Sequence, residues 1–244
     1  MCKEMGLNDY PMLFAHKNKK NQEEVSGMKK SQIGQYYPVN LNICGRRCIV
    51  IGGGEVALRK VQILLEYGAE VDVISPELDL RLIKLAKDNQ IRTFARDYKD
   101  GDLEGSFIVV AATDSDEINS QVSAEARRRS ILINVVDDAK RSDFIVPSVM
   151  RRGDITITVS TSGRSPALAR KLRTQIEQEI GQGYAALTNL IAEVRQEIIR
   201  DGIKVSGDSW QEALQLPTLS KLLTEDGKEK AKHYLLASLK PKQR

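Results

Sequence analysis

The sequence predicts an α/β fold in which a doubly wound parallel sheet is followed by a small helical domain. Three observations support this prediction. Short apolar runs alternate with helical patterns between residues 49 and 136. A glycine triplet joins the first apolar run to the first helical pattern. From residue 166 onward the chain shows only helical periodicity.

The first strand and helix meet at Gly52-Gly53-Gly54, within the stretch from Cys48 to Lys60. Gly52, Gly54 and Ala57 occupy the small positions of the motif G-x-G-x-x-G/A. There the first glycine allows a tight turn, the second lets a pyrophosphate approach the backbone, and the third small residue lets helix and strand pack closely. Free N–H groups at the helix start attract an anion. Because of these flanks, we favour nucleotide binding over a purely structural turn.

The second strand is expected at Glu70–Ser75. An acidic residue at the end of this strand would bind the adenosine ribose. Pro76 and Glu77 follow the strand instead, and Asp72 lies inside it. We therefore expect the backbone around Pro76 and Glu77 to hold the adenosine. Since no arginine stands at the strand end to take a 2′-phosphate, the sequence favours NAD over NADP.

The remaining elements follow the same periodicities. Strands are expected at 91–96, 107–112 and 131–136, and helices at 78–89 and 117–129. Residues 151–154 have the composition of a turn, and the alternating run 155–160 indicates a strand with one polar face, which suits homodimerisation. Ser165 and Pro166 begin a helix. Further helices are expected at 184–200, 210–216, 219–223 and 228–239.

These patterns predict four segments. A flexible polar extension occupies 1–35, and a Rossmann-like NAD-binding domain occupies 36–147. A dimerisation region at 148–183 precedes a helical domain at 184–244.

Composition limits the classes of function. The chain has 244 residues, a net charge of +4, three cysteines and two histidines. The mild charge gives no reason to expect a nucleic-acid partner, and no apolar run has the length of a membrane helix. With so few cysteines and histidines, neither a metal site nor a disulfide scaffold is expected. The N-terminus lacks the apolar core of a secretory signal, and we expect a cytoplasmic protein.

Residues at the carboxyl ends of the later strands are candidates for chemistry. Thr113 ends one strand, and Asp137 follows the apolar strand that ends the sheet. Partial burial there would suit Asp137 to act as a general base or substrate anchor. An Asx turn or helix cap made by Asp137 or Asp138 is the structural alternative, and the pattern alone favours neither.

A donor-rich loop precedes the helix that begins at Pro166. Thr161, Ser162 and Arg164 lie in it, and Arg164 is a candidate for binding substrate carboxylates. For any single arginine, a solvated surface position is the simpler explanation.

Several motifs together resemble the precorrin-2 dehydrogenases, the dehydrogenase module of sirohaem synthase. The resemblance lies in Tyr37–Leu41, Val50–Lys60, Ala112–Asp114, Asn134–Asp137, Phe144–Ser148 and Val159–Arg170, in this order. It extends from about Tyr37 to Glu177 and more loosely through the helical end.

The resemblance implies a homodimer that oxidises precorrin-2, a tetrapyrrole polycarboxylate, to sirohydrochlorin with NAD as cofactor. It places Glu55, Val56, Pro76 and Glu77 against NAD, and it matches Asp137 to the family's key aspartate. Thr161 falls where some members have a serine at the substrate site. The family loop often reads Ser-Ser-Gly-Gly or Ser-Thr-Gly-Gly, so Ser160-Thr161-Ser162-Gly163 departs from it.

Two alternatives remain open. Some members of the family also insert ferrous iron into sirohydrochlorin, so the chain would be a bifunctional dehydrogenase and ferrochelatase. The other alternative is a non-catalytic module that senses NAD without turnover.

Overall fold

The computed structural model describes residues 36–181 and 183–239. The predicted extension at 1–35 lies outside these residues. The four-segment division stays a prediction.

The described chain begins with a parallel sheet of five strands. Their order is β3-β2-β1-β4-β5, and every neighbouring pair is parallel. The strands are β1 Arg47–Ile51, β2 Glu70–Ile74, β3 Ile91–Phe94, β4 Ile108–Ala111 and β5 Leu132–Val135. The chain leaves β1 in one direction for β2 and β3, then returns to the other side for β4 and β5. The predicted doubly wound α/β fold is therefore confirmed, with its switch point between β1 and β4.

Apolar side chains cover both faces of this sheet. Alternate residues of each strand point to opposite faces, so Val50 packs with helices α2 (Glu55–Glu66) and α3 (Leu80–Lys87). Ile49 and Ile51 pack on the other face against helix α4 (Asp116–Arg128). On that second face the segment between β3 and β4 contributes Tyr98 and Leu103, both buried. An irregular segment thus covers part of the sheet that a helix covers in a regular βαβ unit.

The predicted start of α3 needs a correction. The sequence suggested a helix at 78–89, but α3 begins at Leu80 because the side chain of Asp79 accepts from Arg81 N and caps it. Leu78 and Asp79 therefore stay in the loop after β2, where they line a pocket.

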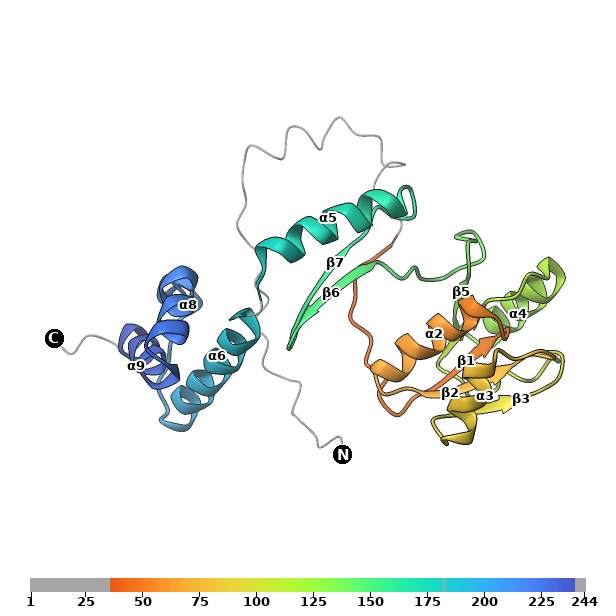
Figure 1. Cartoon of the computed structure of the whole chain (residues 1–244), viewed down its shortest axis with the longest axis horizontal. Helices are drawn as coiled ribbons and strands as arrows, with labels where there is room; N and C mark the ends of the chain where they lie inside the picture. Colours follow the sequence, from red (N-terminus) through yellow and green to blue (C-terminus); the bar gives the residue numbers. More distant parts are fainter. Residues whose placement is uncertain (1–35, 182, 240–244) are drawn as a thin grey trace. The chain divides into compact units, whose positions relative to one another are not determined.

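A two-stranded antiparallel ribbon follows the sheet. It consists of β6 (Ser148–Arg152) and β7 (Ile155–Val159), with helix α5 (Pro166–Glu179) in contact with both strands (Figure 1). The turn prediction for 151–154 was wrong in part, since Arg151 and Arg152 belong to β6 and only Gly153 and Asp154 turn the chain. The predicted start of α5 is confirmed, because Ser165 Oγ accepts from Leu168 N.

Four helices complete the described residues. They are α6 Gly183–Arg200, α7 Gly207–Ala213, α8 Leu216–Glu225 and α9 Lys228–Leu239. Their apolar faces form one core that includes Leu190, Leu219 and Leu235, each fully buried. Within the ranges that the structure describes, no helix combines the length and apolarity needed to cross a bilayer.

Candidate functional site

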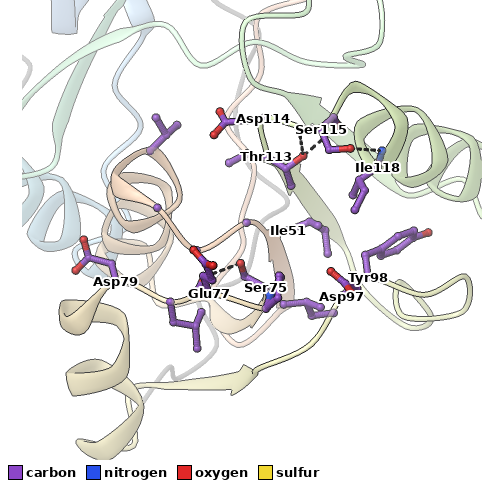
Figure 2. Close-up of a pocket in the computed structure, with 18 of the residues that line it drawn as sticks. Ile51, Ser75, Glu77, Asp79, Asp97, Tyr98, Thr113, Asp114, Ser115 and Ile118 are labelled. Atoms are coloured by element: carbon purple, nitrogen blue, oxygen red, sulfur yellow. Dashed lines mark hydrogen bonds between the residues drawn. The ribbon is translucent and has the colours of Figure 1, made fainter.

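A pocket of about 690 Å³ opens at the carboxyl ends of β1, β2 and β4, at the switch point of the sheet (Figure 2). Open α/β sheets bind their ligands at this position. All eight residues predicted to bind the cofactor line the pocket. They are Gly52, Gly53, Gly54, Glu55, Val56, Pro76, Glu77 and Thr113.

The three glycines are required for different physical reasons. Gly52 has a φ of +121°, and a Cβ there would lie 2.2 Å from the carbonyl oxygen of Ala112. A Cβ on Gly53 would lie 1.9 Å from the carbonyl oxygen of Glu77. At Gly54 a Cβ would meet no atom within 4 Å, so it would stand in open space. Gly52 and Gly53 thus let backbone segments touch, whereas Gly54 leaves room for a ligand.

The start of α2 lies at this open space. Gly54 is its N-cap residue and has no side chain to cap the first-turn N–H groups. Ala57 is fully buried against the sheet and sets the helix close to β1. An open cradle, free N–H groups and the helix dipole together fit a pyrophosphate.

Carboxylates gather around the end of β2. Glu77, Asp79 and Asp97 all line the pocket, and Figure 2 shows Asp79 on one side and Asp97 on the other. Hydrogen bonds from the side chain and backbone of Arg81 lower the pKa of Asp79 to about 2, so it is a carboxylate at neutral pH. Sequence patterns missed Asp79 and Asp97, because one is displaced five residues beyond the strand and the other follows β3.

Tyr98 forms an apolar wall of the pocket together with Ile118. Its hydroxyl donates to the buried carboxylate of Glu125, whose Oε1 lies 2.7 Å from Nε of Arg129. Burial is the main cause that raises the pKa of Tyr98, and the Glu125 carboxylate raises it further. The hydrogen bond to Glu125 therefore fixes the Tyr98 ring at its hydroxyl end. Sequence patterns also missed Tyr98, since it stands in a segment without periodicity.

Thr113 is fixed at the end of β4. Its Oγ1 donates to Asn119 Oδ1 at 2.9 Å, and Asn119 Nδ2 donates back to the carbonyl oxygen of Thr113 at 3.0 Å. Asn119 is buried in α4. This reciprocal pair makes Thr113 a rigid part of the pocket wall.

Asp137 lies beside this wall without lining the pocket. Val136 N donates to the carbonyl oxygen of Ala111 at 2.9 Å, which sets the end of β5 next to the end of β4. Asp137 follows directly, with a left-handed φ of 60°. The expected partial burial of Asp137 was wrong, since its side chain is exposed. Because it extends past the sheet at the ligand edge, solvent reaches it.

The structural alternative applies to Asp138. Asp138 Oδ1 accepts from Lys140 N at 2.9 Å and from Arg141 N at 3.0 Å, which is Asx-turn geometry. Its Oδ2 pairs with Arg141 Nε at 2.5 Å, and this arginine lowers the pKa of Asp138. Asp138 therefore shapes the turn and leaves Asp137 available to a ligand.

The three predicted substrate residues lie outside the pocket. Thr161 Oγ1 accepts from Ser165 N at 2.9 Å, so this hydroxyl helps to shape the turn that begins α5. Ser162 has a φ of 53° and, like Arg164, is exposed. Their role at the substrate stays a prediction.

Asp72, which lies inside strand β2, forms ion pairs with two arginines. Its side chain is 1% exposed and pairs with Arg47 at 2.8 Å and with Arg92 at 2.6 Å. A carboxylate held by two guanidinium groups is unavailable to a ribose.

Comparisons with known proteins agree with this geometry. A family model for an NAD(P)-binding domain matches residues 39–148, and a model for the central part of sirohaem biosynthesis proteins matches residues 152–179. The two matches together span the region whose motifs resemble the precorrin-2 dehydrogenase and sirohaem synthase family. The first model supports a nicotinamide dinucleotide as the class of cofactor.

Two curated relatives are named siroheme synthase. The protein from Nitrosococcus oceani is 39% identical over 183 residues, which are 74% of this chain and 39% of the relative. The protein from Methylobacillus flagellatus is 43% identical over 161 residues, which are 66% of this chain and 34% of the relative. The chain thus spans less than half the length of the curated relatives it matches.

A solved structure supports the fold. The structure of SirC, a precorrin-2 dehydrogenase, aligns with a TM-score of 0.63 at 24% identity. The alignment covers 83% of this chain and 98% of that protein.

Proposed function

We propose that the chain catalyses the NAD-dependent oxidation of precorrin-2 to sirohydrochlorin. The observation that carries this proposal is the convergence of the eight predicted cofactor residues on one pocket at the switch point of the sheet. Asp137 follows the strand next to that pocket. The names of the siroheme synthase relatives and of SirC support the same reaction.

The cofactor and the protein would supply different parts of the proposed reaction. When bound, NAD+ supplies the hydride acceptor for this two-electron oxidation. The open N-terminus of α2 would bind the pyrophosphate, and Thr113 would position the nicotinamide end. Asp137 would accept the proton that leaves the tetrapyrrole, since its carboxylate is exposed at the adjoining strand end. One hydride and one proton leave the substrate, and the products are NADH, sirohydrochlorin and a proton.

NAD, rather than NADP, suits the adenosine end of the pocket. Among the described residues that line it, five carry a carboxylate and none is a lysine, arginine or histidine. Arg81 is near, but it is paired with Asp79 at 2.7 Å and with Glu55 at 2.5 Å. Ribose hydroxyls can donate to these carboxylates, whereas a 2′-phosphate would be repelled.

A homodimer is part of the proposal. Leu168 and Leu172 of α5 are 50% and 39% exposed, and the β6–β7 ribbon has only two strands. A two-stranded ribbon needs further packing for stability, and a second copy would supply it. Leu172→Glu should convert a dimer into a monomer in sedimentation analysis. An unchanged dimer would place the interface elsewhere.

The experiment that tests the function is an anaerobic assay of freshly made precorrin-2 with NAD+. Stoichiometric NADH and sirohydrochlorin support the proposal, and NAD binding without any oxidation favours the NAD-sensing alternative. The bifunctional alternative, which the name siroheme synthase keeps open, is tested by adding Fe²⁺ to sirohydrochlorin. Sirohaem formation above the uncatalysed rate would establish it.

Cytoplasmic localisation is a further part of the proposal. Three cysteines without a Cys-x-x-Cys pair suit a reducing compartment. Cell fractionation with an antibody against the chain tests it, and recovery in the membrane or periplasmic fraction would contradict it.

A further inference from the structure

The charge around the proposed reaction centre presents a physical problem. In the part of the chain that the structure describes, five carboxylate residues and no basic residue line the pocket, and Asp137 adds another carboxylate beside it. The proposed substrate is a polycarboxylate, which these groups would repel. A cation close to Asp137 is therefore needed for the substrate to approach its base.

Lys60 stands at the right place. It lies one helical turn after Val56, on the same side of α2, and Val56 lines the pocket. Val61, the next residue of α2, belongs to the apolar cluster against which Val136 packs. Val136 immediately precedes Asp137, so Asp137 follows the sheet on the side that α2 covers.

The electrostatics of Lys60 agree with this placement. The residue is half-buried, and burial is the main cause that lowers its pKa. The neighbouring charge of Arg59 lowers this pKa further, whereas Asp137 raises it. Asp137 is thus the anion that acts on the Lys60 ammonium.

The two groups are close without being bonded. Among the residues that the structure describes, no carboxylate lies within 4 Å of Lys60 Nζ, and Asp137 has no ion pair of its own. Arg141 differs from Lys60, because it forms ion pairs with Asp138 and Asp116. A half-buried ammonium with free donors is costly unless an anion reaches it, and the substrate can provide one.

We propose that Lys60 binds a carboxylate of the tetrapyrrole substrate next to Asp137. This inference rests on the proposed function and adds a substrate-binding residue to it. The ammonium offsets the charge of Asp137 and fixes one edge of the substrate, so that the carbon losing its proton faces the carboxylate. Lys60 thereby favours tetrapyrroles that carry a carboxylate at that edge.

Three variants test this role. Lys60→Gln removes the charge and keeps most of the stem, and Lys60→Arg restores the charge. Arg59→Gln is the matched control, because it removes the same charge from an exposed position one residue away. Each variant is titrated with sirohydrochlorin, and KM and kcat are measured with precorrin-2. NAD binding and thermal unfolding are recorded in parallel.

Lys60→Gln should weaken sirohydrochlorin binding and raise the KM for precorrin-2 by about tenfold, as loss of one charge-assisted contact does. Lys60→Arg should recover most of this loss, while Arg59→Gln should stay within about twofold of the wild type. NAD affinity should be the same in all four proteins.

Wild-type affinity in Lys60→Gln would overturn the inference. Equal weakening by Lys60→Gln and Arg59→Gln would overturn it too, since only the overall charge would then matter. A loss of NAD binding or of folded protein in Lys60→Gln, with no recovery in Lys60→Arg, would make Lys60 a structural residue. If the wild type itself neither binds sirohydrochlorin nor oxidises precorrin-2, the proposed function fails instead.

Discussion

Replacing Gly54 with alanine separates ligand binding from folding. The added Cβ meets no protein atom within 4 Å, and the φ of −86° at this position is allowed for alanine. Alanine lowers the entropy of the unfolded chain but is a poorer N-cap than glycine, so the free energy of unfolding should change by less than about 1 kcal/mol. The methyl group occupies the space proposed for the pyrophosphate. We expect NAD affinity to fall at least tenfold, or about 1.4 kcal/mol.

Gly53→Ala is the contrasting variant, one residue away. Its Cβ would lie 1.9 Å from the carbonyl oxygen of Glu77, so the backbone after β1 or after β2 must move. Such overpacking costs about 1–3 kcal/mol, which corresponds to a Tm lowered by roughly 2–12 °C in a chain of this size. This variant should lose both stability and NAD binding.

Calorimetric titration with NAD and thermal unfolding without ligand measure the two effects. Gly54→Ala should keep the wild-type Tm and lose affinity for NAD. Wild-type NAD affinity in Gly54→Ala would show that the pyrophosphate does not cross Gly54. Equal destabilisation of both variants would show that the open space at Gly54 does not exist in solution.

Three further predictions concern single side chains. Asp137→Asn should keep the wild-type Tm, because asparagine also adopts a φ of 60°. It should lower kcat at least about 100-fold, and wild-type turnover would remove Asp137 from the mechanism. Asp79→Ser should retain the cap of α3, because serine is also a good N-cap residue. Without the Asp79 carboxylate, the preference for NAD over NADP should fall by about tenfold. An unchanged preference would place the ribose elsewhere. Tyr98→Phe should lower the free energy of unfolding by about 1–3 kcal/mol, because buried Glu125 loses its donor. Since folding raises the pKa of Tyr98 above its unfolded value of 10.0, the stability gained from it is complete below pH 10 and declines above it. The difference between Tyr98→Phe and the wild type in denaturant titrations should therefore shrink above pH 10, and a constant difference would contradict this.

The sheet and the glycine turn could be predicted because each leaves a signal within a short stretch of sequence. The apolar runs that became β4 and β5 are covered on both faces, so their sequences are almost wholly apolar. The glycine motif could be recognised from its spacing alone, although the backbone atoms that require Gly52 and Gly53 belong to Ala112 and Glu77, after β4 and β2. Ala57 is required by the packing of α2 on the sheet.

Features set by tertiary contacts escaped sequence patterns. Tyr98 comes from an irregular segment, and its place in the wall depends on Glu125, 27 residues away. The choice between Asp137 and Asp138 was undecided in the sequence, because it depends on Arg141 and on the path of the turn. Strand β6 was missed since Arg151 and Arg152 carry polar side chains whose pairing with β7 no local pattern reveals.

A crystal structure of the chain with bound NAD would locate the cofactor relative to Gly54 and Asp137. We expect the pyrophosphate to lie against Gly54 and the first turn of α2. We expect the adenosine between Asp79 and Asp97, and the nicotinamide at Thr113 on the side of Asp137. A dinucleotide in the opposite direction, or one bound away from Gly54, would contradict both the cofactor site and the role of Asp137.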